Sequence, residues 1–177
     1  MPNWCANQLL FENESDCDKV WKCMAVPHLK EKFDFVSQNI FFIKCETISF
    51  NKIIPEPKTK EECPERYIKT IESLSDDPRP WFDWYNWRCD HWGVKWDASD
   101  VYLDLNEKSI SFSTPWGPPC DSLLEEIAIK AQVNFSHIYD DGEGNWIPYE
   151  YKYHPDGSCE ECYAAWLEEW NEEFDEE

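Results

Sequence analysis

The order of strand-like and helix-like segments constrains the fold of this chain more than any other feature of its sequence. Apolar residues recur with the two-residue period of a strand in some segments and with helical spacing in others. This order of segments predicts an α+β fold with an antiparallel sheet. Strands are predicted at 7–11, within 33–50, and at 48–54, 101–105, 109–113, 133–139 and 146–153, and helices at 16–26, 64–74, 81–85, 122–131 and from Ser158 onward.

Local signals mark the ends of two of these helices. Ser15 is the expected N-cap of the first helix, and Pro27 is expected to end it. Ser158 and Glu161 have the spacing of a capping box for the last helix. We therefore expect a domain of residues 1–157, with residues 158–177 packed on it as an acidic amphipathic helix.

The composition indicates a folded protein without a membrane segment. Of the 177 residues, 42% are hydrophobic and 16% aromatic, which is enough apolar surface for a core. No basic region precedes an apolar run, and no stretch approaches the ~20 apolar residues of a membrane span. The nine cysteines, without a secretion signal, favour reduced thiols and a cytoplasmic location.

Charge is distributed very unevenly along the chain. The net charge is −21, but residues 1–58 carry 8 acidic and 7 basic side chains, whereas residues 59–177 carry 29 and 9. Residues 140–177 hold 14 acids and one base, Lys152. This balance excludes the usual electrostatic route to nucleic acid and disfavours anionic membranes. It favours a partner with a basic surface.

Two cysteines near the C-terminus have the spacing of a redox or half-zinc motif. Cys159 and Cys162 are separated by Glu160 and Glu161, whose charge opposes thiolate formation. His154 could add a third zinc ligand, but a closed site would need a distant residue such as His137. A structural role is favoured over zinc or redox chemistry, and no cofactor is predicted.

Enzymatic motifs are absent from the sequence. It contains no GxSxG, Walker-type or GxGxxG pattern, and its five glycines leave little room for a phosphate-binding loop. The four histidines show no metal-binding spacing. We therefore do not expect an enzyme.

Tryptophan is concentrated in one segment, with five between Trp81 and Trp96. Aromatic platforms stack bases in single-strand binders, but those platforms lie in basic grooves. Here Arg79, Arg88 and Lys95 are balanced by nearby aspartates. We therefore expect a core or a protein-contact surface.

Four ordered blocks carry a resemblance to a known family. They read MPNWCANQL at 1–9, FNKIIPEP at 50–57, WYNWRCDHWGVKWDA at 84–98 and FSTPWGPP at 112–119. Together they resemble the YubB ferredoxin-like family of small plasmid and bacteriophage proteins. The resemblance implies a ferredoxin-like α+β sandwich with helices on one face of the sheet and no iron–sulfur cluster, extended here by inserted helices.

The sequence departs from that family in several places. Val94 stands where the family has Thr, and Pro115 where it has Ala. Residues 146–148 replace a glycine-containing stretch, and the tail after Gly157 lies outside the resemblance. The family carries no general activity that could be assigned to residues here.

A mobile-element origin and the acidic C-terminal third suggest an inhibitory binding protein. Twenty-one charges match about 36 Å of DNA duplex, so the chain could occupy a basic nucleic-acid channel of a CRISPR effector or another host nuclease. The alternatives are a metal- or nucleotide-binding accessory protein, and a structural accessory protein. The predicted partner-binding residues are Asp140, Asp141, Glu143, Glu168, Glu169, Glu172, Glu173 and Glu176.

Overall fold

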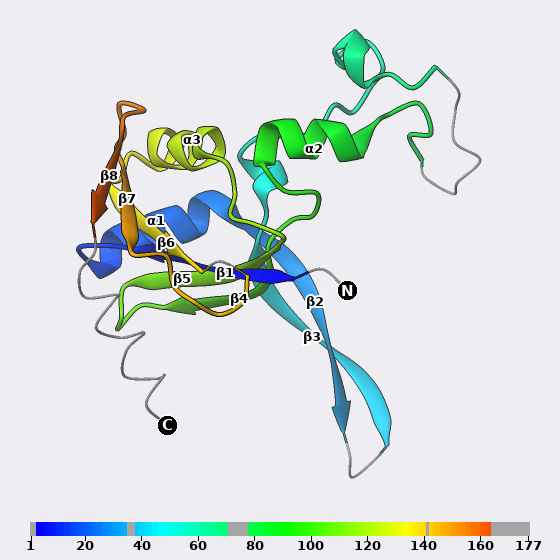
Figure 1. Ribbon diagram of the computed structural model, residues 1–177. Helices are drawn as coiled ribbons and strands as arrows, with labels where there is room; N and C mark the ends of the chain where they lie inside the picture. The colour runs from blue at the N-terminus through cyan, green and yellow to red at the C-terminus, as the bar shows by residue number, and fades with distance from the viewer. Residues whose placement is uncertain (1–2, 35–37, 71–77, 141, 164–177) are drawn as a thin grey trace.

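The computed structural model describes residues 3–34, 38–70, 78–140 and 142–163 (Figure 1). Among these residues no helix is long and apolar enough to cross a membrane. The strands are β1 (Trp4–Leu10), β2 (Ala25–Asp34), β3 (Asn39–Ile48), β4 (Ser99–Asp104), β5 (Ser109–Pro115), β6 (Phe135–Tyr139), β7 (Tyr149–Tyr153) and β8 (Cys159–Tyr163). The helices are α1 (Glu14–Met24), α2 (Trp84–Trp92) and α3 (Asp121–Ala131), with 3-10 turns η1 (Phe50–Lys52) and η2 (Glu65–Tyr67).

The main sheet has the strand order β4-β5-β1-β6-β7-β8, and every neighbouring pair is antiparallel. Within it, β1, α1, β4, β5, α3 and β6 form two interleaved split βαβ units, the ferredoxin-like arrangement. The chain adds β7 and β8 beyond β6. This confirms the predicted α+β, ferredoxin-like antiparallel sheet.

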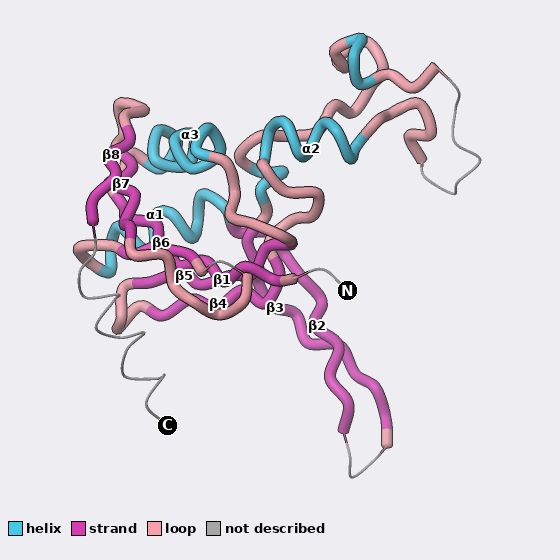
Figure 2. Tube along the Cα trace, viewed as in Figure 1, coloured by secondary structure: helices cyan, strands magenta, loops and turns pink. Residues whose placement is uncertain are grey.

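Two segments inserted between α1 and β4 extend from this sandwich (Figures 1 and 2). The first is a separate two-stranded hairpin of β2 and β3, which projects away from the sheet. The second contains η1, η2 and α2 and extends upward in the view, whereas the hairpin extends downward. The helix predicted at 81–85 is α2, which begins at Trp84 and continues to Trp92. The helix predicted at 64–74 is wrong in its described part, because Glu65–Tyr67 is a 3-10 turn and Ile68 forms a β-bridge with Phe82; residues 71–77 lie outside the described part.

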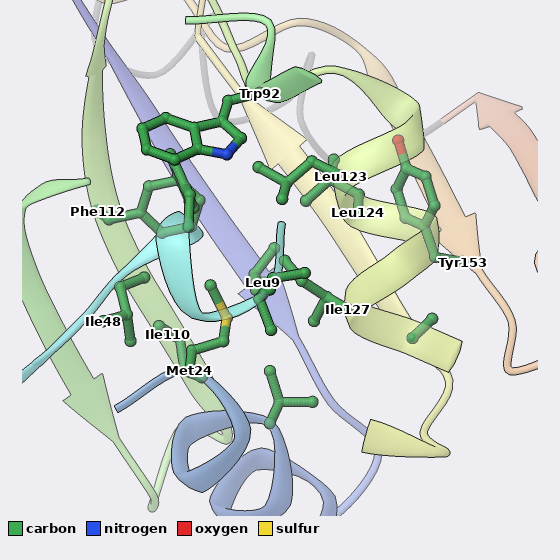
Figure 3. Close-up of a cluster of buried hydrophobic side chains, with 14 of the residues drawn as sticks. Leu9, Met24, Ile48, Trp92, Ile110, Phe112, Leu123, Leu124, Ile127 and Tyr153 are labelled. Carbon is green, nitrogen blue, oxygen red and sulfur yellow. The ribbon is translucent and has the colours of Figure 1, made fainter. Parts of the chain in front are cut away.

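The core lies between the sheet and helices α1 and α3 (Figure 3). Leu9 of the central strand lies between Met24 of α1 and Ile127 of α3, and all three side chains are fully buried. Trp92 of α2 closes one end of this core and donates from Nε1 to the Ile54 carbonyl at 3.0 Å. This burial of aliphatic and aromatic side chains supplies the main stabilisation of the fold.

Three local predictions near the first helix and the hairpin need correction. Asn13, not Ser15, caps α1, because its Oδ1 accepts from Asp16 N at 2.9 Å. Pro27 does not directly end the helix but lies within β2, opposite Glu46. Both strands of this two-stranded sheet are edge strands, where proline, which has no amide proton, is tolerated. The strand predicted at 48–54 is interrupted after Ile48 by η1, whose first amide donates to the Asp97 carboxylate at 2.7 Å.

The predicted C-terminal helix is wrong where the structure describes it. Cys159–Tyr163 is the edge strand β8, paired in register with β7, so the sheet continues across the boundary expected at Gly157. Cross-strand pairing with Tyr149–Tyr153 outweighs the local helical signals. Residues 164–177, which were to form the rest of that helix, lie outside the described residues.

Candidate functional site

A pocket of about 390 Å³ opens where α3 begins above the β6–β7 end of the sheet. We call it the tyrosine pocket. Its walls come from the end of α2, the loop that enters α3, and the helix-facing side of β6 and β7. The described residues that line it are Gly93, Pro118, Pro119, Cys120, Asp121, His137, Tyr139, Tyr151 and Tyr153.

Sheet register places the aromatic residues of the pocket on one face. His137 lies directly opposite Tyr151, so both side chains project to the same side of the sheet. Tyr139 stacks on His137 with ring centroids 5.3 Å apart, and on Tyr151 at 5.9 Å. Because residues two apart on a strand share a face, Tyr153 joins this group.

A glycine brings the end of α2 against the pocket. Gly93 ends the helix with φ +79°, and a Cβ there would lie 2.5 Å from the Cys120 backbone nitrogen. Only glycine accommodates both the conformation and this approach. The contact is held by the Cys120 amide, which donates to the Trp92 carbonyl at 3.0 Å.

Buried hydrogen bonds fix the orientation of the Asn7 side chain under the pocket. Its Nδ2 lies 3.0 Å from the Cys5 carbonyl, an obligate acceptor, and 2.8 Å from Thr114 Oγ1. The Thr114 hydroxyl in turn donates to the Gly117 carbonyl at 2.7 Å. The amide therefore donates from Nδ2 and presents Oδ1 as an acceptor.

This orientation sets the tautomer of His137. His137 Nε2 lies 3.0 Å from Asn7 Oδ1 and must donate to it. Burial lowers the pKa of His137 from its ordinary 6.5 to about 3, so the ring is neutral. The proton is on Nε2, and Nδ1 keeps its lone pair.

Carboxylates surround the other side of the pocket. The Tyr153 hydroxyl donates to Asp121 Oδ1 at 2.7 Å, and burial together with this carboxylate raises the Tyr153 pKa. Burial also raises the pKa of Cys159, and the fields of Asp121, Glu125 and Glu161 raise it further. The pocket lining thus contains one carboxylate, that of Asp121, and no lysine or arginine among the described residues.

Tyr151 is affected by the same surroundings. Burial is the main cause of its raised pKa, and the neighbouring Tyr139 hydroxyl and Glu161 carboxylate add to it. Tyr151 and Tyr153 thus remain protonated at neutral pH. They offer hydroxyl groups that both donate and accept hydrogen bonds.

The cysteine pair does not form a ligand set. Cys159 and Cys162 are three residues apart on a strand, so their side chains point to opposite faces of β8. His154 is held by Asn134, with Nδ1 3.0 Å from Oδ1. Among the described residues no three His, Cys, Asp or Glu side chains are grouped for a metal ion.

Of the acids predicted to bind a partner, the structure describes only Asp140 and Glu143. Asp140 is buried, with 8% of its surface exposed, and its Oδ1 accepts from the backbone amides of Ala6 at 2.7 Å and Gly142 at 3.1 Å. Its carboxylate therefore binds backbone groups of the fold and is not part of the exposed acidic surface. Glu143 is exposed. The other predicted positions lie outside the described residues: Asp141, Glu168, Glu169, Glu172, Glu173 and Glu176.

The tryptophan-rich segment is divided between core and surface. Trp87 and Trp92 are buried in the core, as one of the two predictions for this segment required. Trp96 remains 38% exposed and, together with Trp116, lies against Lys95, whose Nζ is 3.9 and 3.6 Å from the two ring centroids.

A second pocket, of about 350 Å³, lies between β6, β7 and the end of β1. It contains Lys152 as well as Glu12 and Glu150, so its charges are mixed. The tyrosine pocket, by contrast, is lined by Asp121, His137 and three tyrosines without a basic side chain among the described residues. We therefore take the tyrosine pocket, together with the acids beside it, as the candidate functional site.

The sequence did not identify this site. His137 was considered only as a distant zinc ligand, Asn7 only as the first residue of the strand predicted at 7–11, and Asp121 directly precedes the helix predicted at 122–131. Asn7 and His137 are 130 positions apart, so no local spacing reveals their contact. The motif blocks gave one clue, because Gly93, Pro118 and Pro119 lie in two of them and line the pocket.

Comparison with known families bears on the half of the chain that contains the pocket. Residues 91–177 match the family model described as the ferredoxin-like domain in Api92-like protein. The match agrees with the ferredoxin-like arrangement of the structure, to which β1 and α1 also belong. Its match supports similarity to the Api92-like family, whereas the YubB family and a plasmid or phage origin stay predictions.

Among solved structures, one similar protein is api92 from Yersinia pseudotuberculosis. It is 14% identical with a TM-score of 0.39, and the match covers 45% of this chain and 29% of that chain. The similarity thus spans less than a third of the Yersinia protein. No curated protein matches the chain.

Proposed function

We propose that this protein binds a basic nucleic-acid-binding surface of another protein and thereby blocks it. The class of partner that the motif resemblance suggests is a CRISPR effector or another host nuclease. The observation that carries the proposal is the unbalanced acidic charge: residues 59–177 carry 29 acidic and 9 basic side chains, and Glu160 and Glu161 are exposed on the edge strand β8. An unbalanced acidic surface costs self-repulsion, which a basic partner would relieve.

The adjacent sheet edge extends the acidic surface. Glu160 and Glu161 are both exposed on β8, the edge strand of the sheet. Glu150 lies on the neighbouring β7, where Lys152, opposite Glu160, is the one base between residues 140 and 163. We define Glu150, Glu160 and Glu161 as the acidic edge, in which Glu161 projects to the pocket side of the sheet and Glu150 and Glu160 project to the other side.

A charge-neutralised variant tests the proposal. Guide-loaded CRISPR effectors and restriction nucleases, each purified, are measured for binding of target duplex in competition with the full chain. We expect at least one to be displaced from DNA by the wild-type chain. The triple variant Glu150→Gln, Glu160→Gln, Glu161→Gln should compete about tenfold more weakly, from roughly 0.5 kcal/mol for each lost ion pair.

The matched control neutralises three acids in the nearly neutral N-terminal third. Glu12→Gln, Glu14→Gln and Glu46→Gln together make the same change in net charge, and all three positions are exposed. This control should compete like the wild type. Equal loss in both variants would show that only net charge matters, and no competition with any member of the panel would refute the proposed function.

A second variant tests the tail. Neutralising Glu168, Glu169, Glu172 and Glu173 together should weaken the same competition and reduce its dependence on salt. Unchanged competition would show that these four tail residues do not contribute to binding, and it would leave the proposed role of the acidic edge unaffected.

A further inference from the structure

The tyrosine pocket has the donors and acceptors of a receptor for a cationic group. Among the described residues that line it there is a carboxylate, an imidazole and three phenols, and no lysine or arginine. An anion would meet Asp121 directly, with Glu161 nearby. The lining therefore selects against negative charge.

His137 supplies an acceptor that the fold has left unused. The ring is 1% exposed and forms part of the pocket wall. Its Nε2 proton is committed to Asn7, and no hydrogen-bond partner for Nδ1 occurs among the described residues. A ligand N–H group in the pocket could donate to this nitrogen.

The aromatic residues add a surface that suits a delocalised cation. Tyr139, Tyr151 and Tyr153 border the pocket, and their hydroxyl oxygens can accept hydrogen bonds. Tyr153 already donates to Asp121, which leaves the lone pairs of its oxygen available. Guanidinium and ammonium groups combine several N–H donors with attraction to aromatic rings.

We propose that the tyrosine pocket binds an organic cation, the guanidinium or ammonium group at the end of an arginine or lysine side chain. Asp121 supplies the opposite charge, and His137 Nδ1 and the tyrosine hydroxyls accept the N–H groups. The identity of the cation as a side chain of a partner rests on the proposed function. The pocket then holds one basic residue of the partner, while the acidic edge binds the surrounding charges.

Small probes test the pocket without any partner protein. The full chain is titrated at constant ionic strength with n-butylguanidinium and n-butylammonium, which mimic the two side-chain ends. n-Butanol and butyrate serve as neutral and anionic controls of the same length. Binding is followed by NMR of the His137 and tyrosine ring resonances. The cations should bind saturably, with a dissociation constant on the order of 1 mM, and the controls about tenfold more weakly or not at all.

A pair of variants separates the pocket from the overall charge. Asp121→Asn removes the charge but keeps an oxygen that can accept from Tyr153, so the fold should be preserved, which thermal unfolding checks. It should weaken cation binding about fivefold. Asp156→Asn makes the same charge change at an exposed turn residue and should have no effect.

Three results would overturn the proposal: no saturable binding of either cation, butanol binding as tightly as the cations, or equal weakening by both aspartate variants. The partner competition described above can succeed when this titration fails, and the reverse also holds. Each result therefore refutes only its own proposal.

Discussion

At the scale of single residues, Asn7 determines the chemistry of His137. Its amide is oriented by the Cys5 carbonyl and Thr114, and its remaining oxygen takes the Nε2 proton of the imidazole. A histidine held in this way is a neutral acceptor at physiological pH. It is therefore unsuited to the role of a pH sensor in that range.

The neutrality of His137 predicts how stability depends on pH. Its pKa is 6.5 in the unfolded chain and about 3 in the folded one, so the unfolded chain binds the extra proton between these values. The free energy of unfolding should therefore fall as pH decreases from 6.5, by up to about 1.4 kcal/mol per pH unit for this group.

Urea unfolding at a series of pH values between about 7 and 5, above the range in which most carboxylates titrate, measures this slope. In His137→Gln the contribution of this residue should disappear. An identical slope in the variant would contradict the assignment.

Asn7 itself should be important for stability. Asn7→Leu leaves the Nε2 proton of His137 and the Cys5 carbonyl without their partner, which should cost about 3 kcal/mol. Urea unfolding gives the value. The control is Gln8→Leu, one position along β1 on the opposite face and half-buried, which should change the free energy of unfolding by less than about 1 kcal/mol. Equal effects would mean that the buried network adds nothing.

At the scale of elements, the segments with strong local signals were predicted and the others were not. The helix α1 shows its buried face at Cys17, Val20 and Met24, and the β4–β5 hairpin is joined by a short polar turn. The strand β8 was mistaken for a helix because Ser158 and Glu161 have capping-box spacing. Its true state depends on pairing with β7, which a local pattern does not contain.

The β2–β3 hairpin should be dispensable for the stability of the sandwich. It belongs to a separate sheet and exposes Leu29 and Phe42 at 57% and 63%. Because Leu29 lies opposite Lys44, residues 30–43 can be replaced by Asn-Gly without changing the register. The melting temperature should change by less than about 4 °C, equivalent to roughly 1 kcal/mol.

Differential scanning calorimetry checks this, with far-UV circular dichroism to confirm the remaining strands. A large loss of stability would show that the hairpin supports the core. Exposed apolar side chains also make the wild-type hairpin a candidate contact surface.

At the scale of the whole molecule, fold and charge are largely independent. The apolar periods predicted an α+β fold with an antiparallel sheet and the motif resemblance implied its ferredoxin-like form, whereas the net charge of −21 is borne mostly by residues after position 58. The sequence therefore predicted the architecture and the acidic character. It did not predict the tyrosine pocket, which requires residues of β1, α3, β6 and β7 to meet.

Self-repulsion predicts that salt stabilises the protein. Raising NaCl from about 20 mM to about 300 mM shortens the screening length severalfold and should raise the melting temperature by roughly 3 °C. The acidic-edge variant should melt higher than the wild type in low salt and show a smaller salt effect. A melting temperature that falls with salt would indicate that attractive ion pairs dominate.

The central position of β1 has a consequence for synthesis of the protein. This strand is made first, yet its two neighbours are β5 and β6, so that Asn7 pairs with Phe112 on one side and Tyr139 on the other. Until residue 139 has left the ribosome, β1 cannot pair with both of its neighbouring strands. Its apolar residues lack part of their sheet partners meanwhile, which favours binding of chaperones to the nascent chain.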